Sequence, residues 1–99
     1  MARYVEIRKH SEKSLKHYYH VKTEDGGKYD FFICIDTKNK NLLFFKGTDF
    51  SKQFAKISLE KSESLKIEGI PESLVGVIFV KAYRAIKENN FPSRLDYCV

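Results

Sequence analysis

The sequence predicts an α+β fold: an antiparallel sheet of four to five strands formed by consecutive hairpins, with one long C-terminal helix packed on one face. Such a fold is a two-layer sandwich. Before residue 60, short runs of alternating apolar side chains are separated by turn residues. Residues 71–90 instead repeat apolar side chains with the helical period. The 99 residues make a single domain, 1–99, long enough to bury one core without a metal or disulfide.

The first expected strand is the run RYVEIRK, residues 3–9. Val5 and Ile7 alternate there with polar side chains, which is typical of a half-buried strand, and we expect it at a sheet edge. The polar run HSEKS that follows is expected to end this strand.

The runs HYYHVKT and YDFFICID flank the turn residues DGG and predict a hairpin. A loop of three residues sets Lys22 opposite Asp30 and Lys16 opposite Asp36, so that opposite charges face each other across the strands. A loop of two residues sets Val21 against Asp30 and shifts the faces. We favour three because of the charge pairing.

Strand alternation divides the side chains of this hairpin between two faces of the sheet. One face is expected to carry His17, Tyr19, Val21, Phe31, Ile33 and Ile35. The other is expected to carry Tyr18, His20, Lys22, Phe32 and Cys34. His17 and His20 therefore point to opposite faces and cannot bind one metal ion. We expect no metal site and no cofactor.

A second turn, DTKNKN, displays Lys38 and Lys40 at its tip and leads into the run LLFFKG. Apolar side chains on both faces of that run predict a central strand. Residues 49–61 are ambiguous, because apolar side chains recur there at both helical and strand spacings. We favour a turn at 47–52 and a strand near 54–60 over a helix.

The run IPESLVGVIFVKAYRAIKENN predicts the long helix. Pro71 suits the first helical position, and Glu72 complements the positive end of the helix dipole. Apolar side chains fill about half of the helix circumference, as expected for a helix packed on a sheet. The asparagines at 89–90 and Pro92 end it. The tail SRLDYCV is expected to add a short strand or to cover an edge.

Composition excludes several classes of protein. The formal charge is +5, but 14 of the 18 basic residues are lysines dispersed among carboxylates, which favours a solvated surface over a sequence-specific nucleic-acid reader. Cys34 and Cys98 have no metal-type spacing. The N-terminus shows no secretory signal, and no apolar run reaches the roughly 20 residues that span a bilayer. We expect a cytoplasmic protein with no membrane partner.

One helix covers one face of a sheet, so the second face is expected to stay open with its apolar side chains, among them Tyr18, Phe32, Cys34, Leu42 and Phe44. An open apolar patch of several hundred Å² is typical of a partner surface. We therefore expect a small non-enzymatic interaction module that binds a protein partner or self-associates as a homodimer. It would use this face or an edge strand. The expected surface consists of Tyr18, His20, Lys22, Phe32 and Phe44.

The alternative is a domain that binds single-stranded nucleic acid through the same face. Its aromatic rings would stack on bases, while Lys38 and Lys40 would contact phosphates. No RNP1-like pattern occurs, however, and the element order is not that of an RRM. An enzyme is less favoured still, because Cys34 with His20 is the one thiol–histidine pair and no third residue orients it. We expect no catalytic residue.

Overall fold

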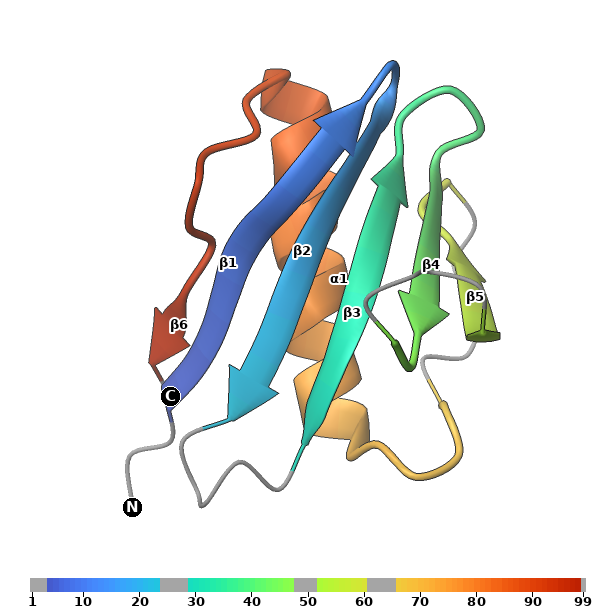
Figure 1. Ribbon diagram of the computed structural model, residues 1–99, viewed down its shortest axis with the longest axis vertical. Helices are drawn as coiled ribbons and strands as arrows, with labels where there is room; N and C mark the ends of the chain where they lie inside the picture. The colour runs from blue at the N-terminus through green and yellow to red at the C-terminus, as the bar shows by residue number, and fades with distance from the viewer. Residues whose placement is uncertain (1–3, 24–28, 48–51, 61–65, 99) are drawn as a thin grey trace.

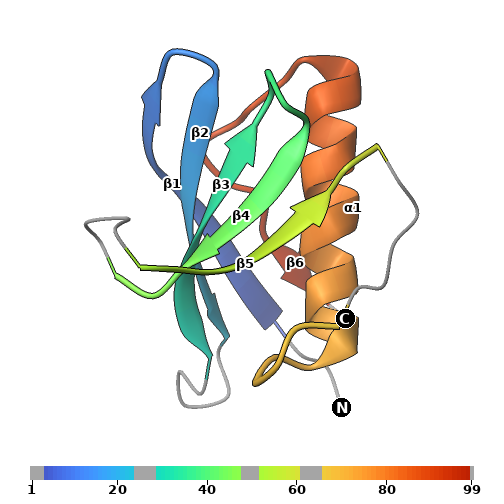
Figure 2. The same cartoon turned by 90° about the vertical axis from the view of Figure 1, so that its right-hand side faces the viewer.

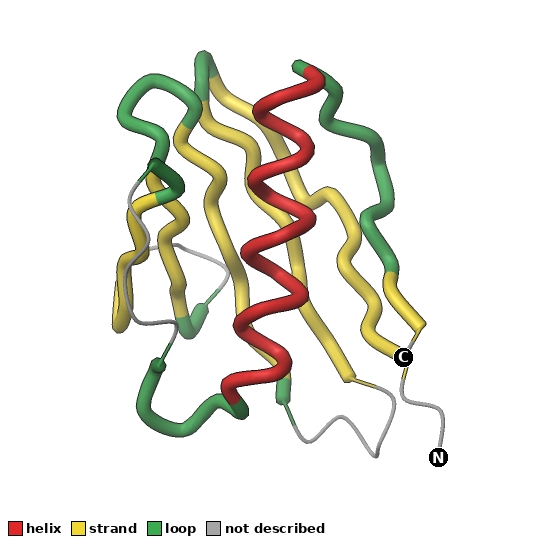
Figure 3. The backbone as a smooth tube through the Cα atoms, turned by 180° about the vertical axis from the view of Figure 1, so that it is seen from behind, coloured by secondary structure: helices red, strands yellow, loops and turns green. Residues whose placement is uncertain are grey.

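The computed structural model describes residues 4–23, 29–47, 52–60 and 66–98, and it confirms the predicted α+β fold (Figure 1). The strands form one antiparallel sheet in the order β5-β4-β3-β2-β1-β6. A single helix, α1, lies against one face of this sheet (Figures 2 and 3). The elements are β1 (Tyr4–Lys13), β2 (Lys16–Thr23), β3 (Asp30–Asp36), β4 (Asn41–Phe45), β5 (Gln53–Ser58), α1 (Glu72–Glu88) and β6 (Tyr97–Cys98).

The main core lies between α1 and the sheet. The predicted register of β2 against β3 is confirmed, with Lys22 opposite Asp30 and Lys16 opposite Asp36. The turn between these strands, residues 24–28, lies outside the described residues. Because this register fixes the faces, the side chains that were expected under the helix are buried there: Tyr19, Val21, Phe31, Ile33 and Ile35.

The predicted faces of β4 are wrong. Leu42 and Phe44 were expected on the open face, but both are fully buried in the core under α1. The cause is the turn at residues 37–40. The residues that flank this turn, Asp36 and Asn41, pair with each other. Strand pairing then sets Ile33 opposite Phe44, so the two side chains share the helix-covered face.

Strand β1 is longer than expected, because the run HSEKS continues it to Lys13. Ser11, Glu12 and Lys13 still pair with β2, although they extend beyond the core. The ladder shifts between Lys9 and Ser11, which leaves His10 as a bulge. The turn follows with Ser14, whose φ is +58°.

Residues 53–58 form the strand β5, so the strand interpretation of this region is confirmed and the helix alternative is wrong. Strand β5 lies at one edge of the sheet and pairs only with β4 among the described strands. No second layer of described helix or strand covers the sheet face opposite α1.

The helix begins one residue later than expected, with Pro71 as the residue before it. Asn89 ends it in the left-handed conformation at φ 50°, and its N–H donates to carbonyl oxygens of the last turn. The tail then runs beside β1 and forms β6, which confirms the expected edge strand. Strand β1 therefore has a neighbour on both sides, so the expectation that it lies at a sheet edge is wrong. No helix in the described part of the chain is both long and apolar enough to cross a bilayer.

Candidate interaction surfaces

Four of the five residues predicted for the partner surface follow the expected face, and Phe44 does not. Tyr18 and Phe32 belong to a small apolar cluster on the face opposite α1, together with Cys34, Leu43 and Phe45. His20 and Lys22 alternate with the buried side chains of β2 and lie on the same face. Phe44 is 0% exposed on the other side of the sheet and cannot contact a partner.

This face is not the open apolar patch that the sequence indicates. Phe32 is only 8% exposed and Phe45 only 7%. The ring of His20 stacks on Phe32 at 4.5 Å between centroids, and the ring of His10 meets it edge-on at 5.5 Å. The imidazole of His20 is also bound to the carboxylate of Asp30. The two histidine rings cover Phe32, so this ring offers little apolar surface to drive association.

His10 was missed because the sequence did not show that β1 continues past Lys9. Alternation along β1 places it on the uncovered face, but the polar run around it suggested the end of the strand. Only the pairing of β1 with β2 brings its ring to Phe32.

Cys34 is poorly suited to act as a nucleophile. Its side chain is 0% exposed, and burial raises the pKa of the thiol to about 11. A catalytic cysteine needs the opposite shift, because the thiolate is the reactive form. His20 is on the same face, but its ring contacts Phe32 and Asp30.

His17 lies on the opposite face from His20, as strand alternation predicts. Its ring stacks on Phe91, and its Nδ1 is 3.5 Å from the carboxylate of Glu12. Burial is the main cause that lowers the pKa of His17, with the charge of Lys9 as a second cause. Among the described residues, no group of three or more His, Cys, Asp or Glu side chains is arranged to hold a metal ion.

The edge of the sheet at β1 is closed by the tail. Backbone hydrogen bonds join Lys9 N–H to the carbonyl of Ser93, and Leu95 N–H to the carbonyl of Ile7, both at 2.7 Å. The Asp96 carboxylate continues the ladder by accepting from Ile7 N–H at 2.9 Å. Without the tail, the N–H groups of Ile7 and Lys9 and the carbonyl of Ile7 would face outward from the sheet.

Two side chains hold Asp96 in this position. The Tyr4 hydroxyl donates to Oδ2 at 2.6 Å, and Arg94 Nε donates to the same oxygen at 2.7 Å. Burial opposes ionisation of Asp96, but the hydrogen bonds from Tyr4, Ile7 and Arg94 outweigh it and lower the pKa of the carboxyl. The charged form is therefore the one that closes the edge.

The edge at β5 has no such cover among the described residues. Leu59 N–H donates to the carbonyl of Lys40 at 2.8 Å, so Leu59 is a hydrogen-bonded position of the β4–β5 ladder. Hydrogen-bonded and non-hydrogen-bonded pairs alternate along antiparallel strands. The register then turns the backbone N–H of Lys56 away from β4, toward the outside of the sheet.

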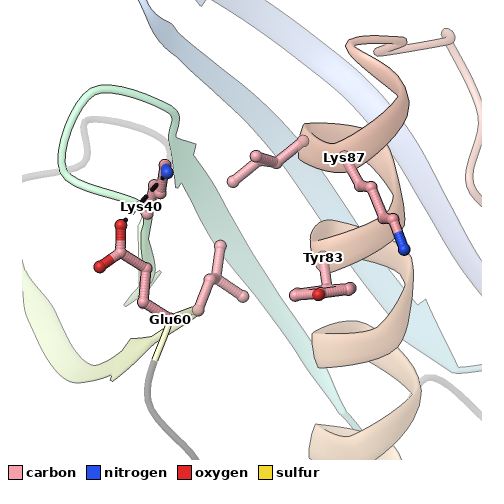
Figure 4. Close-up of a pocket in the computed structure, with 6 residues that line it drawn as sticks. Lys40, Glu60, Tyr83 and Lys87 are labelled. Atoms are coloured by element: carbon pink, nitrogen blue, oxygen red, sulfur yellow. Dashed lines mark ion pairs between the residues drawn. The ribbon is translucent and has the colours of Figure 1, made fainter.

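A groove of about 380 Å³ lies between the end of β5 and the second half of α1 (Figure 4). Leu59 and Ile86 supply its apolar lining, and Tyr83, which is 48% exposed, forms one wall. On the sheet side, Lys40 and Glu60 form an ion pair at 3.3 Å.

The two lysines predicted as a joint phosphate contact are separated by the fold. Lys40 pairs with Glu60 beside the groove at α1. Lys38 instead lines a different cleft, between the β3–β4 turn and the β1–β2 turn. They therefore do not form one basic tip.

Comparisons with known proteins identify no relative of this chain. No protein-family model, no curated protein and no solved structure matches the chain. The functional argument therefore depends on the residues and their arrangement.

Proposed function

We propose that this protein is a small non-enzymatic interaction module that binds an extended segment of a partner protein along the outer edge of β5. One observation carries the proposal: among the described residues, the two edges of the sheet are treated differently. Residues 93–98 cover β1, whereas no described strand lies beside β5 on the side to which the N–H of Lys56 points. Such an edge is a template for an added strand.

The groove beside β5 supports the same mode of binding. An added strand points every second side chain toward the α1 side of the sheet. There it meets the apolar lining of Leu59 and Ile86 and the exposed ring of Tyr83. Backbone hydrogen bonds would supply affinity, and this groove would select an apolar side chain.

The shielding of Phe32 argues against the two uses of the uncovered face considered from the sequence. A base that stacks on Phe32 would have to displace His20, which already occupies a position 4.5 Å from the ring. A protein partner on that face would gain little from Phe32, Cys34 and Phe45, which are more than nine-tenths buried already. The β5 edge is free of both objections.

We also propose a cytoplasmic location, in line with the free, buried thiol of Cys34. Imaging of the chain fused to a fluorescent protein tests this part of the proposal. A fusion found outside the cytoplasm would contradict it.

The test of the edge uses Lys56→Pro with Lys56→Ala as its matched control. Proline removes the outward N–H of residue 56 but leaves the bonds to β4, and alanine removes only the side chain. A phage-displayed library of random peptides is selected on the wild-type protein, and the affinities of selected peptides are measured on all three proteins. Sedimentation velocity on the same proteins reports self-association.

We expect selected peptides to bind wild type and Lys56→Ala alike, and to lose at least about tenfold in affinity on Lys56→Pro, because one ladder bond is lost and the carbonyl that accepted it is left without a donor. A homodimer that dissociates in Lys56→Pro alone would identify a second copy as the partner. Peptides that bind Lys56→Pro as well as wild type would refute the edge. So would a library that yields no binder while the protein stays monomeric.

A further inference from the structure

The turns of two hairpins lie side by side at one end of the sheet (Figure 1). Thr37 of the β3–β4 turn holds them together, because its N–H and its hydroxyl both donate to the carbonyl of Leu15, at 2.9 and 2.7 Å. Between the turns is a cleft of about 430 Å³, within the range of small-molecule sites. Its lining consists of Lys13, Ser14, Leu15, Lys16, Tyr18, Asp36, Lys38 and Asn39.

Three lysines line this cleft, and one of them, Lys16, is opposite Asp36 across β2 and β3. Lys13 and Lys16 are directly opposite each other across β1 and β2, an arrangement of like charges that destabilises a sheet. Lys38 comes from the other turn. Within the described ranges none of the three forms an ion pair, whereas Lys9 pairs with Glu12 and Lys40 with Glu60.

Asp36 is the one carboxylate in the lining, and its oxygens are already engaged. Oδ1 accepts from the backbone N–H groups of Lys38 and Asn39 at 3.1 and 3.2 Å, and Oδ2 accepts from the Asn39 amide at 3.0 Å. The side chain holds the turn and is buried. Three lysines and one aspartate leave the cleft with a formal charge of +2.

We propose that this cleft binds a phosphate-bearing anion. Lysine ammonium groups are compact charges on flexible stems, so three of them can surround an anion that has several oxygens. Such an anion would also reduce the repulsion between Lys13 and Lys16, of which only Lys16 faces a carboxylate across the sheet. The exposed side chain of Leu15 and the ring of Tyr18 offer an apolar contact to whatever carries the phosphate.

Two sources share this chemistry: a free oligophosphate, and the backbone of a single-stranded nucleic acid. Both are different from the protein segment proposed for β5, and the cleft shares no residue with that edge. Binding at the turns can therefore be tested independently of binding at β5.

The experiment titrates inorganic tripolyphosphate and, separately, a single-stranded thymidine oligonucleotide into the protein at one fixed low salt concentration. Amide chemical shifts locate the binding and give the affinity. The variant Lys13→Gln/Lys38→Gln removes two positive charges from the cleft, and Lys52→Gln/Lys56→Gln removes two from exposed positions on and beside β5. Lys16 is left in place because it opposes Asp36 in the ladder.

We expect shifts at Leu15, Lys16 and Lys38, and at least about a tenfold loss of affinity in the cleft variant against less than about threefold in the control. If only one probe behaves in this way, it identifies the source of the phosphate. Equal losses in both variants would mean general attraction to a basic protein and would overturn the site. So would the absence of shifts at the turns. If the cleft variant does not fold, Lys38→Gln against Lys52→Gln gives the same comparison.

Discussion

The imidazole ring of His17 lies parallel to the phenyl ring of Phe91, with 3.7 Å between their centroids and 1° between their planes. The contact joins β2 to the segment that follows α1. The Nδ1 atom of His17 is buried, and the Glu12 carboxylate at 3.5 Å forms no hydrogen bond with it, so the cost of burying a charge outweighs this carboxylate and favours the neutral ring. Burial accordingly lowers the pKa of His17 below its usual value of 6.5.

This pKa predicts a loss of stability in mild acid. The unfolded chain binds a proton at His17 more readily than the folded chain does, so the contribution of the neutral ring is present above pH 6.5 and is lost as the pH falls below it. We expect His17→Phe, which keeps the stack, to lose less in melting temperature than wild type between about pH 7.5 and pH 5.5. Equal losses in the two proteins would contradict the assignment.

The Asp96 carboxylate is predicted to be a main support of the tail. Asp96→Ala leaves Ile7 N–H without its acceptor, and it also removes the partner of Tyr4 and Arg94. We expect the free energy of unfolding to fall by about 1–3 kcal/mol, as measured by urea denaturation. Asp96→Asn keeps an acceptor oxygen for Ile7 and should lose less. A loss as large in Asp96→Asn as in Asp96→Ala would show that the charge, and not the bond to Ile7, holds the tail.

Phe44 and Phe45 are adjacent in β4 but lie on opposite faces, so their truncations should differ. Phe44→Ala opens a cavity in the fully enclosed core under α1 and should cost about 3–5 kcal/mol. Phe45→Ala should cost less, because its small cluster lies on the uncovered face, where neighbours and water can fill the space. Thermal or urea unfolding of both variants checks this order. A larger loss of stability in Phe45→Ala than in Phe44→Ala would contradict the burial of Phe44 in the core.

The thiol of Cys34 is predicted to be unreactive in the folded protein. A pKa of about 11, against 9.0 when unperturbed, lowers the thiolate fraction near neutral pH by about 100-fold. In a Cys98→Ser background, we expect iodoacetamide to label Cys34 at least about 100-fold more slowly in buffer than in denaturant. Rates within a factor of a few of each other would contradict both the burial and the pKa.

Local patterns were sufficient to predict the β2–β3 hairpin from the sequence. Opposite charges at Lys16–Asp36 and Lys22–Asp30 selected one register, and that register decided the faces of both strands. The faces to which Phe44 and the other side chains of β4 point depended instead on whether the β3–β4 turn has an odd or an even number of residues. The run DTKNKN is compatible with turns of different length, and a change of one residue reverses every side chain of the strand.

The two surfaces proposed for binding could not be predicted from the periodicity of the sequence. Lys13, Lys16 and Lys38 come together because Thr37 ties one turn to another, a contact between hairpins that no spacing along the chain encodes. The openness of β5 likewise depends on where the tail binds. The sequence indicated that residues 93–99 would cover an edge but could not say which.

The bond between Ile7 and Asp96 joins residues 89 positions apart, whereas β1 to β4 each pair with the next strand along the chain. The five-stranded part of the sheet can therefore assemble by successive short-range closures while the chain is being made. The outer edge of β1 gains its cover only after residues 93–98 have been synthesised, and closing so long a loop adds its own entropic cost. Until then the nascent chain presents two unprotected strand edges instead of one. Its risk of edge-to-edge aggregation is thus greatest before the tail is in place.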